Sequence, residues 1–170
     1  MTAPPVDVRL VRFPLGLVRD LAHGDADRPA DWHEQYETAG IVAISRMLLG
    51  AYAAMDVPVD DTSPWWVFGV VVDGRVVGDA GFHGPPAGSR PVEVEIGYQV
   101  VPAFRRRGVA TRACALLLAH SWCHGAEVVR ADVEPDNPFR AGSLAVLHAN
   151  GFTPTERGDL AVAAPAGGAA

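Results

Sequence analysis

The chain has 170 residues, of which 49% are hydrophobic and 20% are charged; this composition is typical of one folded domain and excludes a disordered chain. A formal net charge of −6 argues against a general nucleic-acid-binding protein. The apolar runs fall well short of the roughly 20 residues that a membrane-spanning helix needs. The first five residues lack the basic and apolar parts of a secretory signal. We therefore expect a cytoplasmic protein that binds neither nucleic acid nor a membrane.

The first half of the chain begins with alternating apolar and polar residues that predict a strand over 6–11. From Leu15 to about Ala54 the apolar spacing is helical, with a break near 23–29. The aromatic residues on this helical stripe are Trp32, Tyr36 and Tyr52. Asp73-Gly74 then joins two β-rich runs, 65–72 and 75–82, and predicts a hairpin.

The second half predicts a strand over 92–101 and a long helix over 107–124 that Gly125 ends. A strand follows over 127–133, and Asn137 is predicted to cap a helix that continues to about Ala149. Short strands over 152–155 and 159–163 complete the order. These elements predict an α/β (α+β) domain over residues 1–163 whose mixed sheet carries helices on both faces. The low-complexity tail 164–170 is expected to be frayed.

The junction between the strand 92–101 and the following helix is the most informative segment. A strand that turns directly into a helix exposes unpaired backbone N–H groups at the positive end of the helix. Gly108 lets the backbone approach a ligand closely, and Ala110 places only a small side chain in the next helical turn. Positive charge is added by Arg105, Arg106 and Arg107. This combination suits a pyrophosphate. The alternatives are a solvated charge run or a nucleic-acid patch, and the patch lacks aromatic interleaving and a second basic cluster.

The same residues carry a family resemblance. Arg105-x-x-Gly108-x-Ala110 resembles the Gln/Arg-x-x-Gly-x-Gly/Ala signature of the GNAT acetyltransferase superfamily, in the same strand-to-helix context. Glu95-Ile96-Gly97-Tyr98 resembles the branch that acetylates the N-termini of ribosomal proteins. A downstream group of residues resembles the second motif of the family: Asn137, Ser143 and Asn150-Gly151-Phe152. The resemblance extends from about Val6 to Phe152.

This resemblance implies a mostly antiparallel sheet of about seven strands that splays between its fourth and fifth strands. Acetyl-CoA would lie in that splay as co-substrate. Its pantetheine arm would bond to the backbone of Tyr98, Gln99 and Val100. Its pyrophosphate would be held around Arg105 and by the amides of Arg106, Arg107, Gly108, Val109, Ala110 and Thr111. Asn137 would contribute a further cofactor contact.

Candidate catalytic groups lie on the fourth strand and the last helix. Glu93 and Glu95 are two residues apart, so both point to one face about 7 Å from each other. Two close carboxylates in a partly dry site are expected to raise the pKa of at least one, which favours a general base. Glu95 is the preferred base and Glu93 the other candidate; the alternative is that both are polar residues on a half-exposed strand.

The general acid departs from the family pattern. Many relatives place a Tyr after the Gly-Phe pair, but no Tyr follows Tyr98 here. The resemblance to the ribosomal-type branch instead implies a Ser on the fourth helix as the acid, and Ser143, eight residues before Gly151, matches its position. Asn137 lies six residues before Ser143 rather than the usual three, and Arg140 occupies the expected Asn position.

These features predict acetyl transfer from acetyl-CoA to a primary amine, either a small molecule or a protein N-terminus. Two alternatives remain open: a GNAT-fold module that binds acyl-CoA without turnover, and an interaction protein whose first helices form a homodimer. His120, Cys123 and His124 have metal-ligand spacing on one helix face, but without a distant fourth ligand no metal site is predicted.

Overall fold

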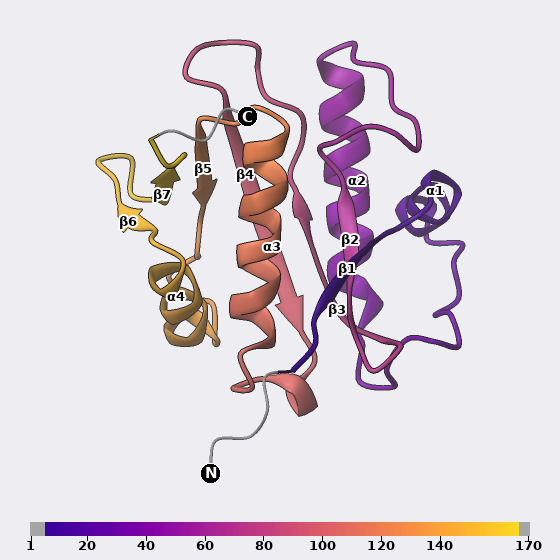
Figure 1. The fold of residues 1–170 in the computed structure, drawn as a ribbon. Coiled ribbons are helices and arrows are strands. Elements are labelled where there is room, and N and C mark those ends of the chain that lie inside the picture. The colour runs from indigo at the N-terminus through magenta and orange to yellow at the C-terminus, as the bar shows by residue number, and fades with distance from the viewer. Residues whose placement is uncertain (1–5, 167–170) are drawn as a thin grey trace.

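The computed structural model describes residues 6–166, in which seven strands form one sheet in the order β1-β2-β3-β4-β5-β7-β6. The strands and helices follow one another in the predicted order, apart from a short 3-10 turn after β4 (Figure 1). The strands are β1 (Arg9–Arg12), β2 (Val67–Val72), β3 (Arg75–Phe82), β4 (Glu93–Val100), β5 (Val128–Ala131), β6 (Thr153–Pro154) and β7 (Leu160–Ala163). The helices are α1 (Leu15–His23), α2 (Thr38–Ala54), α3 (Val109–Cys123) and α4 (Arg140–Ala149).

The sheet is mixed and mostly antiparallel, which confirms the predicted fold class. All neighbouring strands pair antiparallel except β4 and β5, which run parallel. The parallel ladder is short: it pairs only residues 93–95 of β4 with residues 128–130 of β5. Because β4 continues to Val100 while β5 ends at Ala131, β5 lies beside the first part of β4 only (Figure 1). This divergence is the predicted splay.

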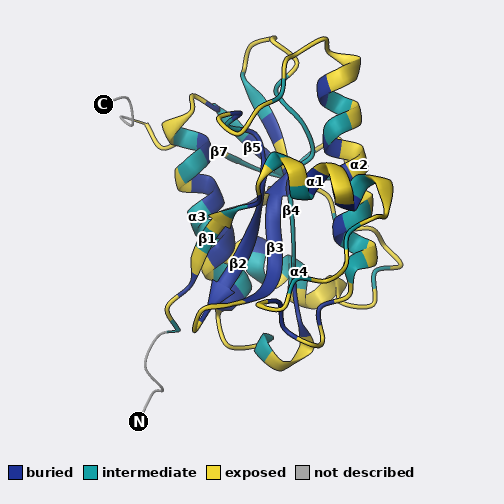
Figure 2. Cartoon of the chain, turned by 90° about the vertical axis from the view of Figure 1, so that its right-hand side faces the viewer, coloured by how far each residue is buried: buried dark blue, intermediate teal, exposed yellow. Residues whose placement is uncertain are grey.

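Helices cover both faces of the sheet. Phe68 and Phe82 face α3, where the ring of His120 lies 5.3 Å and 5.6 Å from theirs. Gly69 and Gln99 point to the opposite face, and there Gly40 of α2 lies against the Gln99 amide. The middle strands β2 and β3 are buried, whereas the helices expose their outer surfaces to solvent (Figure 2). Apolar burial on both faces is the main stabilising contribution to such a sheet.

The β2–β3 hairpin forms where the sequence predicts it. Asp73 and Gly74 both have positive φ, 49° and 77°, as a two-residue type I′ turn requires. Asp-Gly is favoured there because Gly, and to a lesser extent Asp, tolerates the left-handed region. The hairpin therefore follows directly from local sequence.

The segment between α1 and α2 is not helical, so the predicted helical stripe is wrong for Trp32 and Tyr36. Trp32 forms an isolated bridge with Val76 at the end of the hairpin, and His33 N–H donates to the Val76 carbonyl at 2.8 Å. Both aromatic side chains are buried against the sheet. Pairing with the sheet thus outweighs the helical spacing of the segment.

Two further boundaries differ from the prediction. Helix α4 begins at Arg140 rather than after Asn137, and Asn137 Oδ1 accepts a hydrogen bond of 2.8 Å from Phe139 N–H in the preceding turn. The cap prediction for Asn137 is therefore wrong. Of the predicted frayed tail, residues 167–170 lie outside the described residues, while Ala164 N–H donates to the Glu127 carbonyl. None of the helices between residues 6 and 166 has the length and apolarity needed to cross a membrane.

Candidate active site

The splay exposes one edge of β4. His83 N–H donates to the Glu95 carbonyl at 3.0 Å and Val101 N–H donates to the Val77 carbonyl at 2.9 Å, so the odd-numbered residues direct their backbone groups toward β3. Tyr98 and Val100 direct theirs to the other edge, beyond the last pair of the β4–β5 ladder. An extended ligand can pair with such an edge as an added strand would.

The loop from Arg105 to Gly108 leads from this edge into α3. Arg106 and Gly108 have positive φ, 58° and 77°, and Arg112 N–H makes the first bond of the helix, to the Gly108 carbonyl at 2.9 Å. Within the described part of the chain, the backbone N–H groups of residues 106–111 donate no hydrogen bond. Six consecutive free amides at the positive end of a 15-residue helix have the geometry and charge that suit an anion.

The three arginines of this loop have different roles. Arg105 Nε donates to the Val100 carbonyl at 2.8 Å, and its guanidinium lies 4.0 Å from the centre of the exposed Phe139 ring. This side chain therefore joins the end of β4 to the loop before α4. Arg106 and Arg107 are exposed and add positive charge beside the free amides.

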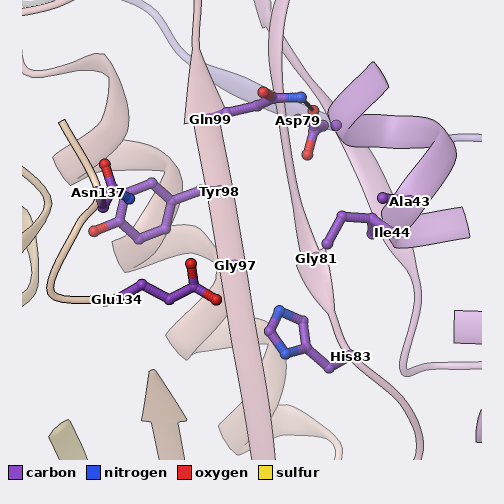
Figure 3. A pocket seen from close by; sticks show the side chains of 11 residues that line it. Ala43, Ile44, Asp79, Gly81, His83, Gly97, Tyr98, Gln99, Glu134 and Asn137 are labelled. Atoms are coloured by element: carbon purple, nitrogen blue, oxygen red, sulfur yellow. Dashed lines mark hydrogen bonds between the residues drawn. The ribbon is translucent and has the colours of Figure 1, made fainter. Parts of the chain in front are cut away.

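A pocket of about 510 Å³ opens on the α2 face of the sheet and crosses β4 at the splay (Figure 3). Strands β3 and β4 provide its floor, α2 one wall, and the loop between β5 and α4 the other. The lining residues are Gly40, Ala43, Ile44, Asp79, Gly81, His83, Gly97, Tyr98, Gln99, Glu134 and Asn137. The pocket thus meets the exposed edge of β4 from the side opposite to α3.

Glu93 is held by two arginines outside this pocket. Arg130 donates to both of its carboxylate oxygens, at 2.8 Å and 3.0 Å, and Arg157 adds a contact of 3.2 Å. The hydrogen bond from Arg130 lowers the pKa of Glu93. The expectation that the two carboxylates raise each other's pKa is therefore wrong, because each has a basic partner of its own.

Glu95 is paired with a histidine that lines the pocket. His83 Nδ1 lies 3.0 Å from Glu95 Oε1, and the hydrogen bond from His83 lowers the pKa of Glu95. The other ring nitrogen, Nε2, lies over Gly97, only 2.9 Å from where a Cβ of that residue would be. Gly97 thus leaves room for the imidazole above the floor of the pocket (Figure 3).

Asp79 also lines the pocket and, like His83, is not among the site residues predicted from the sequence. It is buried, with 4% of its surface exposed, and both Tyr36 Oη–H and Gln99 Nε2–H donate to its Oδ2, the latter at 2.5 Å. Burial raises the pKa of Asp79 to about 6, against these two hydrogen bonds, which lower it. Burial also raises the pKa of the Tyr36 hydroxyl, so this phenol is a neutral donor.

Tyr98 and Ser143 are brought together across the splay. Tyr98 Oη–H donates to the main-chain carbonyl of Ser143 at 3.0 Å, and burial raises the pKa of Tyr98. The ring of Tyr98 points toward Asn137 (Figure 3), and both residues line the pocket, whereas Ser143 does not.

The site contains no candidate metal centre. Among residues 6–166 there is no group of three or more His, Cys, Asp or Glu side chains that could hold a metal ion. His120 is instead part of the packing under α3, where its Nε2 lies 2.7 Å from the Pro64 carbonyl.

Comparisons with solved structures identify the fold. A proposed acetyltransferase, YncA from Salmonella typhimurium with its cofactor acetyl-CoA, is 20% identical over 96% of each chain, with a TM-score of 0.55. RimJ from Mycobacterium smegmatis, in complex with a CoA disulfide, is 22% identical over 92% of this chain and 81% of that chain, with a TM-score of 0.57. RimL, a ribosomal L7/L12 alpha-N-protein acetyltransferase in complex with coenzyme A, is 15% identical over 94% and 96%, with a TM-score of 0.57.

A comparison with curated proteins finds no significant match. In contrast, the model of the family described as "Acetyltransferase (GNAT) domain" matches residues 17–153, most of the chain. These residues include the exposed edge of β4, the amide-rich loop and the pocket. The chain therefore belongs to the GNAT family of acetyltransferases.

Proposed function

We propose that this protein transfers the acetyl group of acetyl-CoA to a primary amine. The proposal depends on three features that adjoin one another. They are the free amides of residues 106–111, the exposed edge of β4 at Tyr98 and Val100, and the pocket that reaches this edge from the other side. A long ligand with an anionic group at one end can follow this path. The amine would enter through the pocket.

The donor would be held largely by main-chain groups. The amides of residues 106–111 would bind the pyrophosphate, with Arg106 and Arg107 adding charge. Tyr98 N–H and C=O and Val100 N–H would bind the pantetheine arm, whereas the Val100 carbonyl already accepts from Arg105. Asn137 Oδ1 also has a partner, Phe139 N–H, so its side-chain amide N–H would be the group that reaches the donor.

The base that we assign is His83, oriented by Glu95. Glu95 accepts the Nδ1 proton, which leaves the Nε2 lone pair directed into the pocket. Nε2 would take a proton from the amine as its nitrogen forms a bond to the acetyl carbon and the carbon–sulfur bond breaks. Glu95 itself is the alternative base. We keep Ser143, next to the Tyr98 hydroxyl, as the group that protonates the departing thiolate.

The first test compares His83→Ala with His23→Ala, an exposed histidine at the end of α1, in turnover on a panel of primary amines. We expect His83→Ala to lower kcat by about 10²- to 10⁴-fold with acetyl-CoA binding by calorimetry unchanged. The His23 variant should behave as wild type. Glu95→Gln should lower kcat less, because its amide oxygen can still accept the Nδ1 proton.

Three other outcomes decide against parts of this proposal. Wild-type kcat in His83→Ala, together with loss in Glu95→Gln, would assign the base to Glu95. Acetyl-CoA binding without turnover on any amine would identify a binding module. Absence of acetyl-CoA binding by the wild type would refute the proposed donor site.

A further inference from the structure

Asp79 presents one carboxylate oxygen to the pocket. Both of its hydrogen-bond donors, Tyr36 and Gln99, bind Oδ2. Among the described residues no donor binds Oδ1, and this atom keeps some exposure to solvent. Figure 3 shows it turned away from Gln99, into the space that Gly81 and Ile44 line.

This carboxylate also lacks a cationic partner. No arginine or histidine among residues 6–166 forms an ion pair with Asp79, although Glu93 and Glu95 each have one. A buried carboxylate with only neutral donors is costly to keep ionised. The other titratable residues that line the pocket are Glu134, His83 and Tyr98, so no permanent positive charge offsets it. A cation that enters the pocket would therefore be attracted to Oδ1.

The position of Asp79 separates it from the proposed base. Asp79 lies on β3, and His83 directly follows the last residue of that strand. Because His83 N–H still donates to the Glu95 carbonyl of β4, the extended pairing continues to His83. The two side chains, four residues apart, therefore point to the same face, with Cα atoms about 13 Å apart. Between them Gly81 and Gly97 are paired across β3 and β4, and neither carries a side chain. The floor of the pocket is thus bare in the middle and has a polar group at each end.

We propose that Asp79 is a specificity residue that binds a second cationic group of the acceptor, an inference that rests on the proposed function. The acceptor class is then a primary amine that carries a further ammonium or guanidinium group several ångströms away. The nucleophilic amine lies at His83, and the second cation pairs with Asp79 Oδ1. Tyr36 and Gln99 are positioning residues that fix the carboxylate from behind.

The test uses two matched series of acceptors, the 1,4- to 1,6-diaminoalkanes and the n-alkylamines of equal length, at pH 7.5. The wild type is expected to show kcat/KM at least 10-fold higher for the best diamine than for its monoamine. Asp79→Asn, which keeps the shape of the side chain, should abolish this preference through KM, and Asp79→Glu should restore part of it. In the wild type the preference should also decline as the pH falls through about 6, where Asp79 becomes protonated.

Melting curves supply a readout that needs no turnover. Without acetyl-CoA, the best diamine should raise the wild-type Tm more than the matched monoamine does, and Asp79→Asn should lose the difference. Equal kcat/KM and equal Tm shifts for the two series would overturn this inference while leaving amine acetylation intact. Absence of turnover with every amine would instead refute the proposed function, and the melting comparison would still decide the role of Asp79.

Discussion

Asp79 is a buried carboxylate whose hydrogen-bond donors, Tyr36 and Gln99, are both neutral. Desolvation favours its protonated form, and burial raises its pKa from the ordinary 3.8 to about 6. Between these two values the folded protein holds a proton that the unfolded chain has already released. The free energy of unfolding contributed by this residue therefore falls as the pH rises from about 4 to 6 and stays low above that range.

Asp79→Asn is consequently expected to stabilise the fold at neutral pH. The pKa of Asp79 differs by about 2 between the folded and unfolded states, which corresponds to roughly 3 kcal/mol in the free energy of unfolding. This value is an upper bound for the effect of the substitution. Urea unfolding at pH 4, 5, 6 and 7 measures this effect. The free energy of unfolding of the variant, relative to that of the wild type, should increase as the pH rises. A stability difference that does not vary with pH would show that Asp79 titrates normally in the folded state. The expected stabilisation, combined with weaker binding of the acceptor by Asp79→Asn, would show that Asp79 is a site residue that costs stability.

At the scale of elements, helix α3 is bounded by two glycines in the left-handed region, Gly108 at φ 77° and Gly125 at φ 82°. A Cβ at either position would meet no atom within 4 Å. A substitution therefore acts through backbone strain, which costs about 1 kcal/mol at such a position. Only the first of these two ends carries the free amides of the proposed pyrophosphate site.

Gly108→Ala and Gly125→Ala thus form a matched pair. Both are expected to lower the free energy of unfolding by about 1 kcal/mol. Only Gly108→Ala should raise the Kd of acetyl-CoA in calorimetry, because it disturbs the amides beside the proposed pyrophosphate site. Equal affinity in the two variants would remove that loop from the binding site.

At the scale of the whole molecule, one arginine connects three strands of the C-terminal half of the sheet. Arg130 of β5 donates to Glu93 of β4 and to Asp159, the residue before β7. Its side chain is 17% exposed, so water screens these contacts only in part. The splay interrupts the backbone ladder between β4 and β5 after three pairs, and this ion network reinforces the sheet where that ladder is short.

Arg130→Met is expected to lower the free energy of unfolding at pH 7 by about 2 kcal/mol, since it leaves two carboxylates without their shared partner. The pKa of Glu93 is lowered in the folded state, so the contribution of the pair is present above pH 4.5 and is lost as the pH falls below that value. The deficit of the variant should therefore shrink at pH 3. Arg75→Met, which removes the exposed pair with Glu34, is the control and should change stability by less than about 1 kcal/mol. Similar losses in both variants would contradict a special role for Arg130.

The sequence by itself determined the order of the elements, the β2–β3 hairpin and the loop from Arg105 to Ala110. Each depends on a local preference: alternation along a strand, Asp-Gly in a type I′ turn, and glycine where φ is positive. Such preferences act over a few residues, so they can be read without knowing what packs against them. The GNAT signature is a pattern of this kind, and the family match over residues 17–153 agrees with it.

Only the tertiary structure decided which side chains meet in the pocket. The pairing of His83 with Glu95 depends on the register of β3 against β4 across a connection of ten residues, 83–92, and a connection of that length does not fix the register. Tyr36 reaches Asp79 because its segment follows the sheet instead of continuing a helix. Glu93 is bound to Arg130 because β5 returns beside β4. Charge partners and pKa shifts arise from contacts between segments distant in sequence, and for these contacts the chain carries no local signal.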